Sequence, residues 1–228
     1  MKKLIVTAAL ALSISGNALA ADINSPTYAY DWSGFYAGFQ AGGGWGTTEL
    51  PWEDVAPGLP FTDNDGPIDI SGFAGGVHAG YLRQSGAWVF GGEATLDYAP
   101  LKGDDGSTGG DLNVFDGRWM LSLIGKAGRA IDRTLVYGLA GAAWVNSSVS
   151  DEDIINPDYA PQNYNAFGGV VGVGVGHALT DRLSARLEYR YQFFQESNRQ
   201  TFNCGGFCYD MAVQPKFSTV QVGLSYKF

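Results

Sequence analysis

The fold is decided by the stretch Val220-Gln221-Val222-Gly223-Leu224-Ser225-Tyr226-Lys227-Phe228. Its apolar residues occupy every second position, and the positions between them are polar or small. Successive side chains of a β-strand point to opposite faces, so this period of two predicts a strand with one apolar and one polar face. The same alternation recurs in other parts of the chain, and the fold follows from how these segments are spaced.

Eight segments have the length and composition of strands, separated by alternately long and short connections. The predicted strands are 34–47, 70–83, 87–99, 117–130, 134–147, 166–179, 183–195 and 217–228. Each is at least as long as the ~9–11 residues that a tilted strand needs to cross a bilayer. Outer-membrane barrels have short periplasmic turns and longer external loops. The spacing therefore predicts an all-β fold: an eight-stranded antiparallel up-and-down transmembrane β-barrel, with both ends on the side of the short turns.

The two faces are clearest in three of the strands. The strand 183–195 carries leucines and aromatic residues on one face and polar or charged residues on the other, and 87–99 and 117–130 are divided in the same way. None of the three has a charge on its apolar face between its ends. An Arg or Lys that faced lipid at mid-depth would cost about 2–4 kcal/mol, which explains the avoidance.

Two strands are harder to orient. In 166–179 we interpret the alternate glycines as facing inward, where they make room for large residues of neighbouring strands, and we expect His177 to point outward near the periplasmic edge. In 134–147 the parity of Trp144 predicts an inward side chain, which suggests that this residue lies above the membrane.

The first twenty residues have the features of a secretory signal peptide. Met1-Lys2-Lys3 is a short positive segment, Leu4 to Ile14 is apolar except for two residues, and Ala18-Leu19-Ala20 is a small-residue cleavage site. We expect cleavage between Ala20 and Ala21. The expected organisation is a signal peptide over 1–20, an N-terminal periplasmic segment over 21–33 and an outer-membrane β-barrel domain over 34–228.

The composition excludes one class of partner and favours a barrel. The formal net charge is −9, whereas nucleic-acid binding rewards clusters of Lys and Arg. Only 16% of the residues are charged, 14% are aromatic and 33 are glycine. Sparse charge with abundant aromatic residues fits a barrel that is apolar outside and polar inside better than a glycine-rich soluble sandwich.

Two motifs carry a resemblance to a known family. The first is Trp32-Ser33-Gly34-Phe35-Tyr36-Ala37-Gly38 followed by Gly42-Gly43-Gly44, and the second is Leu179-Thr180-Asp181 followed by Ser184-Ala185-Arg186 and Glu188-Tyr189-Arg190-Tyr191. With the last strand, they resemble the porin-like surface-antigen barrels of alphaproteobacteria, a family of small immunogenic outer-membrane proteins, some described as haem-binding. The resemblance covers the strands but not the loops. It implies a location in the cell outer membrane, and an assembly signal read by the barrel-assembly machinery at Val220, Val222, Leu224, Tyr226 and Phe228.

Charged residues on the inner faces form the main candidate site. An eight-stranded barrel is just wide enough to be filled by its own side chains, so these charges predict a structural plug, with a narrow polar conduit as the alternative. Those at similar depth are Glu93, Lys126, Arg186, Glu188 and Arg190, and His78 is a further candidate. Because buried charges persist only with partners, we expect Glu93 to pair with Lys126 and Glu188 to lie among arginines.

Catalysis has little support in the sequence. Some small outer-membrane barrels are lipid acylases or proteases that use His with Ser or Asp, but this chain has only His78 and His177. A nucleophile must lie within hydrogen-bond distance of its base, and neither Ser71 nor Ser85, the serines nearest His78 in sequence, is clearly within reach. We predict that the protein is not an enzyme.

The long connections contain the remaining candidates. In an exported chain, Cys204 and Cys208 predict a disulfide that staples a small loop, since no His lies near to complete a metal site. The loops 48–69 and 148–165 are acidic and could attract divalent cations, but Asp63-Asn64-Asp65-Gly66 lacks the rest of an EF-hand loop, so solvated loop tips are the simpler interpretation. We predict no metal and no cofactor. Haem, implied only by the resemblance, could in principle be ligated by the following residues: Tyr159, Tyr164, Tyr209 and Met211.

The predicted function is structural and surface-interactive: membrane integrity and contact with a host or the environment, with a largely plugged lumen. The competing hypotheses are a small porin for polar solutes and a barrel that binds haem or another ligand at the surface. The expected partners are outer-membrane lipid and lipopolysaccharide, the assembly machinery and a host or surface ligand. We expect a monomer.

Overall fold

A computed structural model describes residues 30–54, 62–64, 67–104, 111–153, 162–204 and 207–228. Eight long strands run through it: β1 (Gly34–Glu49), β4 (Ile68–Ser85), β5 (Trp88–Tyr98), β7 (Asp111–Ile131), β8 (Thr134–Asp153), β9 (Gln162–Ala178), β10 (Leu183–Phe194) and β13 (Gln214–Lys227). Five short strands lie between them: β2 (Pro51–Asp54), β3 (Thr62–Asn64), β6 (Lys102–Asp104), β11 (Gln200–Cys204) and β12 (Phe207–Met211). Among the described residues, no helix is long and apolar enough to cross a membrane.

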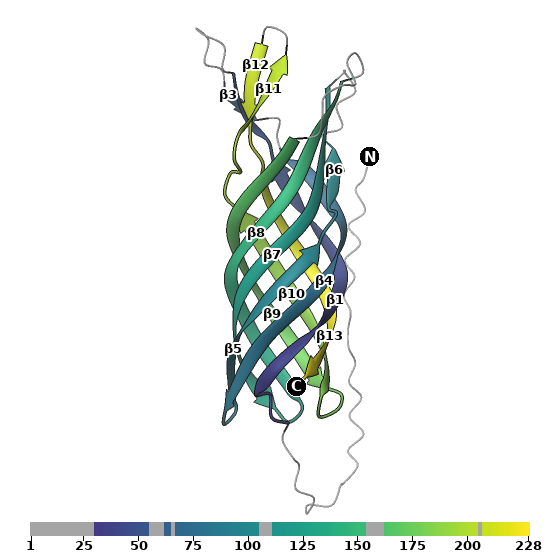
Figure 1. Ribbon diagram of the computed structural model, residues 1–228, viewed down its shortest axis with the longest axis vertical. Coiled ribbons are helices and arrows are strands. Elements are labelled where there is room, and N and C mark those ends of the chain that lie inside the picture. The colour runs from purple at the N-terminus through teal and green to yellow at the C-terminus, as the bar shows by residue number, and fades with distance from the viewer. Residues whose placement is uncertain (1–29, 55–61, 65–66, 105–110, 154–161, 205–206) are drawn as a thin grey trace, which may run out of the picture.

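The eight long strands close into a barrel, as Figure 1 shows. They follow the order β1-β13-β10-β9-β8-β7-β5-β4, and β4 pairs with β1 to complete the ring. Every neighbouring pair is antiparallel. The predicted eight-stranded antiparallel up-and-down barrel is therefore confirmed, and each predicted strand overlaps one of the eight long strands.

The short turns and the C-terminus lie at one end of the barrel, and the long connections lie at the other (Figure 1). Gly86 at the β4–β5 turn and Asp132 at the β7–β8 turn have positive φ angles of 58° and 52°. A left-handed residue lets two strands reverse over two residues, and glycine adopts it without steric cost. By the usual rule for these barrels, this end faces the periplasm.

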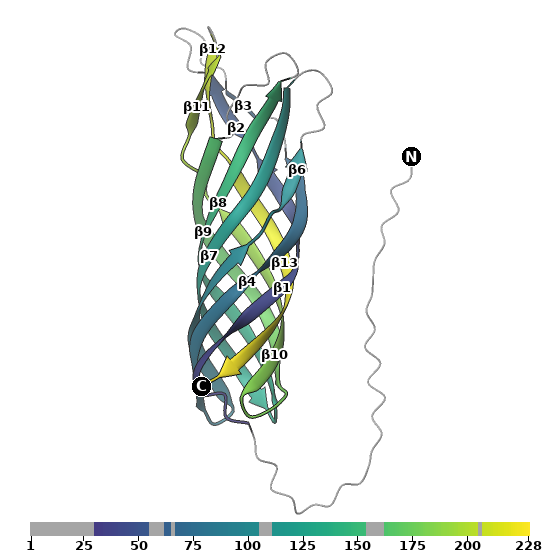
Figure 2. The same cartoon turned by 45° about the vertical axis from the view of Figure 1, so that its right-hand side comes forward.

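The end with the long connections is more regular than the sequence analysis expected. β7 and β8 stay paired as far as Asp111 and Asp153, beyond the predicted limits. A separate four-stranded sheet, in the order β11-β12-β2-β3, lies beyond this end of the barrel (Figure 2). Outside the bilayer no lipid imposes an alternation of apolar residues, so these strands carry no clear signal in the sequence.

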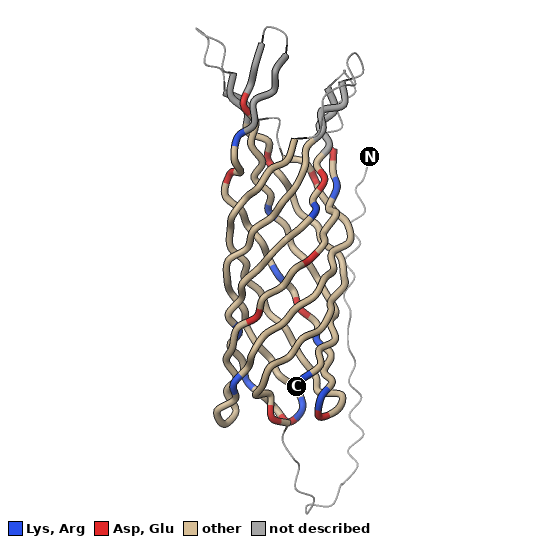
Figure 3. The backbone as a smooth tube through the Cα atoms, viewed as in Figure 1, with Lys and Arg blue, Asp and Glu red and all other residues tan. Residues whose placement is uncertain are grey.

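Burial divides the strands as expected in β5, β7, β9 and β10. Apolar side chains such as Phe90, Leu123 and Val173 are exposed on the outer face, whereas the alternate glycines of β9 have the same inward parity as the buried Val170. His177 is exposed, as expected. Figure 3 shows charged residues at both ends of the barrel and also in its middle, where the charged side chains of Glu93, Lys126 and Arg190 are buried rather than exposed. The outer face therefore presents an apolar surface to lipid.

The orientation predicted for Trp144 is wrong. In β8, Trp144 lies between Leu121 of β7 and Phe167 of β9 in the register, and both of these side chains are exposed on the outer face. The inner face of β8 carries the buried Leu135 and Leu139. Because β8 is apolar on both faces, hydrophobic alternation alone cannot tell which face meets the lipid.

Candidate functional site

The lumen contains a buried cluster of charges contributed by three strands. Glu93 lies on β5, Lys126 on β7, and Arg186, Glu188 and Arg190 on β10. Each has the inward parity of its strand, and each is less than 10% exposed. The structure thus brings together all five charged residues that the sequence analysis placed at similar depth. We call these five residues the lumen cluster.

Lys126 links the two carboxylates of the lumen cluster. Its Nζ donates to Glu93 Oε2 at 2.8 Å and to Glu188 Oε1 at 2.7 Å. Arg186 donates to Glu93 from the other side. Arg190 donates to Glu188 Oε2 from Nε at 2.8 Å and from Nη2 at 2.5 Å. Glu93 and Lys126 therefore pair in the structure, and Glu188 lies between two arginines and a lysine.

Two tyrosines complete the coordination of these carboxylates. The Tyr36 hydroxyl donates to Glu93 Oε2 at 2.7 Å, and the Tyr137 hydroxyl donates to Glu188 Oε1 at 2.5 Å. Both tyrosines lie on the periplasmic side of the cluster. The ring of Tyr137 also lies 5.0 Å from Lys126 Nζ, at a distance suited to a cation–π contact. Neither tyrosine could be recognised as a partner of these carboxylates from the sequence, because hydrophobic alternation treats tyrosine only as an apolar residue.

A layer of amides lies on the extracellular side of the cluster. Asp97 Oδ1 accepts hydrogen bonds from Gln40 Nε2 at 2.7 Å and from Gln221 Nε2 at 3.2 Å, and its Oδ2 lies 3.9 Å from Arg190 Nη1. With Asp97 included, three carboxylates face three cations. This buried core is therefore electrically balanced, which the cost of burying unpaired charge requires.

Apolar side chains fill the lumen towards the extracellular end. On β7 the inward face passes from Lys126 to Met120, and on β10 it passes from Arg190 to Phe194. All the apolar residues of this layer are at least 95% buried: Leu50, Ile68, Ile70, Leu101, Phe115, Met120, Val149, Phe194 and Phe217. We call this set the outer apolar layer.

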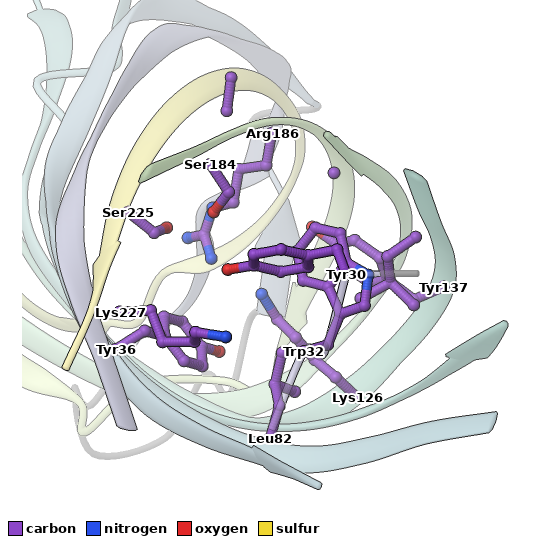
Figure 4. A pocket seen from close by; sticks show the side chains of 13 residues that line it. Tyr30, Trp32, Tyr36, Leu82, Lys126, Tyr137, Ser184, Arg186, Ser225 and Lys227 are labelled. Atoms are coloured by element: carbon purple, nitrogen blue, oxygen red, sulfur yellow. The ribbon is translucent and has the colours of Figure 1, made fainter. Parts of the chain in front are cut away.

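Aromatic and aliphatic residues close the lumen at the periplasmic end. Tyr30 and Trp32, which precede β1, pack there with Tyr36, Leu82 and Leu135. All five line a small cavity of about 40 Å³, together with Lys126 and Arg186. Figure 4 shows Tyr30, Trp32, Tyr36 and Leu82 around it. The polar core therefore lies between two apolar layers.

A histidine–serine contact joins strands from distant parts of the chain. His78 Nε2 lies 2.8 Å from Ser225 Oγ, and both side chains are buried. Gly38 of β1 lies between them in the register, and a Cβ there would be 2.7 Å from His78 Nε2. Within the part of the chain that the structure describes, His78 Nδ1 has no hydrogen-bond partner, so no carboxylate there orients the ring as in a catalytic triad. The serines nearest His78 in sequence are Ser71 and Ser85, whereas Ser225 comes near His78 only when the barrel closes.

The other predicted site residues lie apart from the lumen cluster. The outward positions of the last strand include Val220, Val222, Tyr226 and Phe228, which are exposed, and Leu224, which is half-buried. The backbone of β11 and β12 pairs Cys204 with Phe207 and Cys208 with Asn203. The side chains of the two cysteines and the cleavage site at Ala20 and Ala21 lie outside the described residues, so both predictions remain predictions.

The candidate ligands for metal and haem gain no support. Among the described residues, no group of three or more His, Cys, Asp or Glu side chains could hold a metal ion. Tyr164 and Met211 are buried, so they do not face an external haem. Tyr159 and the side chain of Tyr209 lie outside the described part of the chain. Glu49, in the first acidic loop, lies 3.4 Å from Lys216 Nζ.

Known outer-membrane proteins are similar to this chain in sequence. The family model of the outer membrane protein β-barrel domain matches residues 6–228. A 22 kDa outer membrane protein of Rhizobium leguminosarum bv. viciae is 36% identical over 159 residues, which cover 69% of this chain and 67% of that protein. A 31 kDa outer-membrane immunogenic protein of Brucella melitensis is 27% identical over 250 residues, covering 99% of this chain and 100% of that protein.

A solved structure has the same architecture. The outer membrane protein OprG of Pseudomonas aeruginosa superposes with a TM-score of 0.54 at 14% identity, covering 87% of this chain and 98% of that one. The resemblance to alphaproteobacterial surface barrels is confirmed by the relatives from Rhizobium and Brucella. The chain belongs to the outer membrane protein β-barrel domain family and is a protein of the cell outer membrane.

Proposed function

We propose that this protein is a sealed barrel, whose role is to support the integrity of the outer membrane and to contact the surroundings through its extracellular end. The observation that carries the proposal is the layered lumen. A balanced set of buried charges lies between the outer apolar layer and the aromatic residues at the periplasmic mouth. We propose a monomer, surrounded by lipid and lipopolysaccharide and inserted by the barrel-assembly machinery.

The layering disfavours a porin on energetic grounds. A permeating ion would first have to displace the outer apolar layer and then separate charges that already satisfy one another. Breaking one side of a buried ion pair typically costs about 3–5 kcal/mol. The interior of an eight-stranded barrel is just wide enough to be filled by side chains. Once the layered side chains occupy it, little room remains for a permeating solute.

Conductance in planar bilayers tests the sealed lumen. We expect the wild-type chain, inserted from detergent, to give no steady conductance steps, and a heat-modifiability gel of the same sample to show that it is folded. The positive control is a porin with an open lumen, inserted from the same detergent into the same bilayer, which should give steady conductance steps. Steady large steps from the wild-type chain would overturn the proposal.

A deletion strain tests the role in the membrane. If the barrel supports integrity, cells without it should become more sensitive to bile salts, and the wild-type chain should restore resistance. A chain whose residues 55–61 are replaced by a short Gly-Ser linker should restore resistance equally, because the barrel itself is unchanged. Unaltered sensitivity of the deletion strain would contradict the integrity role and leave surface contact as the remaining function.

A further inference from the structure

The residues just before the first strand fold into the mouth of the barrel. Tyr30 and Trp32 are 6% and 7% exposed, and their rings meet edge to face with centroids 4.8 Å apart. The indole of Trp32 lies against β9, since a Cβ at Gly176 would be 3.3 Å from its Cη2. Figure 4 shows both rings over the small cavity at the periplasmic end. We call Tyr30–Ser33 the latch.

The β4–β5 hairpin holds one side of the latch through Gln84. The Trp32 backbone N–H donates to Gln84 Oε1 at 2.9 Å, and the Gln84 backbone N–H donates to Ser33 Oγ at 2.9 Å. The Gln84 amide also donates to the carbonyl of Gly86 in the turn. One side chain thus fastens the latch and its own turn together.

Two cations from other parts of the rim hold the opposite side. Lys227 Nζ donates to the Asp31 carbonyl at 2.5 Å and lies 4.3 Å from the centre of the Tyr30 ring. The Arg133 guanidinium lies 5.6 Å from the same ring and donates from Nε to the Ala178 carbonyl at 3.0 Å. The latch therefore connects the β7–β8 turn, the end of β9 and the last strand.

The chemistry of these contacts suits a closure that can open. Asp31 is exposed. Its carboxylate accepts a hydrogen bond from the Ser33 backbone N–H, which lowers the pKa of this carboxyl group. Arg133 and Lys227 are partly exposed, and a cation–π contact or hydrogen bond made by a partly solvated cation is individually weak. Trp32 Nε1 is buried and has no hydrogen-bond partner among the residues that the structure describes. The latch is thus held by several weak contacts around one buried indole.

We propose that the latch is a periplasmic lid: closed, it separates the lumen cluster from periplasmic water, and open, it exposes the floor of the mouth formed by Lys126, Arg186 and Ser225. The lid goes beyond the proposed seal of the lumen, because the outer apolar layer at the other end does not depend on it. Opening the latch alone should therefore admit water and small reagents to the mouth without creating a continuous channel.

Cysteine accessibility in the full-length chain tests the lid. Ser184 lines the cavity and is half-buried, so Ser184→Cys, in a background with Cys204→Ser and Cys208→Ser, reports on the mouth. With the chain in lipid nanodiscs, we expect slow reaction of this thiol with a charged methanethiosulfonate. Trp32→Ala should accelerate the reaction at least ~10-fold, because local opening limits the labelling of a protected group. Gln84→Ala should have an intermediate effect.

Three controls make the result decisive. Thr180→Cys, on the exposed β9–β10 turn, should react quickly and equally in all backgrounds. Phe35→Ala, an exposed aromatic beside the latch, should leave the Ser184→Cys rate unchanged. A heat-modifiability gel verifies folding of each variant. The lid is wrong if Ser184→Cys reacts as quickly as Thr180→Cys in the parent, or if Trp32→Ala changes nothing. Conductance of the wild-type chain would contradict the seal while leaving this result intact.

Discussion

Lys126 joins the two carboxylates of the lumen cluster, since its ammonium group lies 2.8 Å from Glu93 and 2.7 Å from Glu188. Methionine has a similar length and no charge, so Lys126→Met leaves both carboxylates buried with the guanidinium groups as their remaining cations. Removing one partner of a buried ion pair costs about 3–5 kcal/mol. We expect the free energy of unfolding of the refolded barrel to fall by about that amount, measured by urea titration in detergent.

The matched control for this residue is Lys102→Met. Lys102 lies 3.6 Å from Asp116, and its side chain is 65% exposed. Exposed ion pairs contribute about 0–1 kcal/mol, so the control should change the unfolding free energy little. Equal losses of unfolding free energy in Lys126→Met and Lys102→Met would contradict a stabilising role for the Lys126 ammonium group in the lumen cluster.

At the scale of the strand, β9 shows how small residues on one strand leave room for large side chains of the neighbouring strand. Gly174 lies opposite Tyr137 of β8, and a Cβ at Gly174 would be 2.5 Å from Tyr137 Cζ. The ring cannot easily move away, because its hydroxyl is bonded to Glu188. We therefore expect Gly174→Ala to destabilise the barrel by about 1–3 kcal/mol, the usual cost of overpacking, in the same urea titration.

A glycine on the lipid side separates packing from glycine flexibility. At Gly92 of β5, which faces outward, an added Cβ would meet only one backbone oxygen, at 3.8 Å. Gly92→Ala should therefore be nearly neutral. In the background Tyr137→Leu, the cost of Gly174→Ala should shrink, because the clashing ring atoms are gone. If Gly174→Ala destabilises the Tyr137→Leu background as much as the wild type, the strain does not arise from the contact between Gly174 and Tyr137.

The long strands show which parts of the fold could be predicted from the sequence. All eight were predictable, because the outward-facing positions of a strand in lipid, which are every second residue, are mostly apolar. The short strands β2, β3, β6, β11 and β12 were not, since nothing imposes that pattern beyond the bilayer. The outward position of Trp144 was missed because β8 is apolar on both faces.

At the scale of the whole molecule, the candidate site consists of successive layers of side chains inside the closed barrel. The depth of charges along separate strands predicted the pairing partners Glu93 and Lys126, because depth follows from counting along a regular strand. The contact of His78 with Ser225 could not be found in this way, because it crosses the seam where the first strand meets the last. The roles of Tyr36 and Tyr137 could not be predicted, because the hydrogen-bond partner of an inward tyrosine hydroxyl is known only once the neighbouring strands are placed.

Phe228 distinguishes assembly of the molecule from its stability. The ring is 79% exposed at the periplasmic rim and packs edge to face on Tyr226, while its backbone N–H donates to the Phe35 carbonyl. Phe228→Ala keeps that hydrogen bond and removes only the ring. If the terminal aromatic is an assembly signal, the variant should be depleted from the outer membrane of expressing cells, measured as the heat-modifiable fraction. Refolded in detergent, it should lose no more stability than Phe35→Ala, which removes an exposed ring from the same rim. Depletion of both variants to the same extent would mean that rim aromatics anchor the barrel in lipid and that the last residue carries no separate signal.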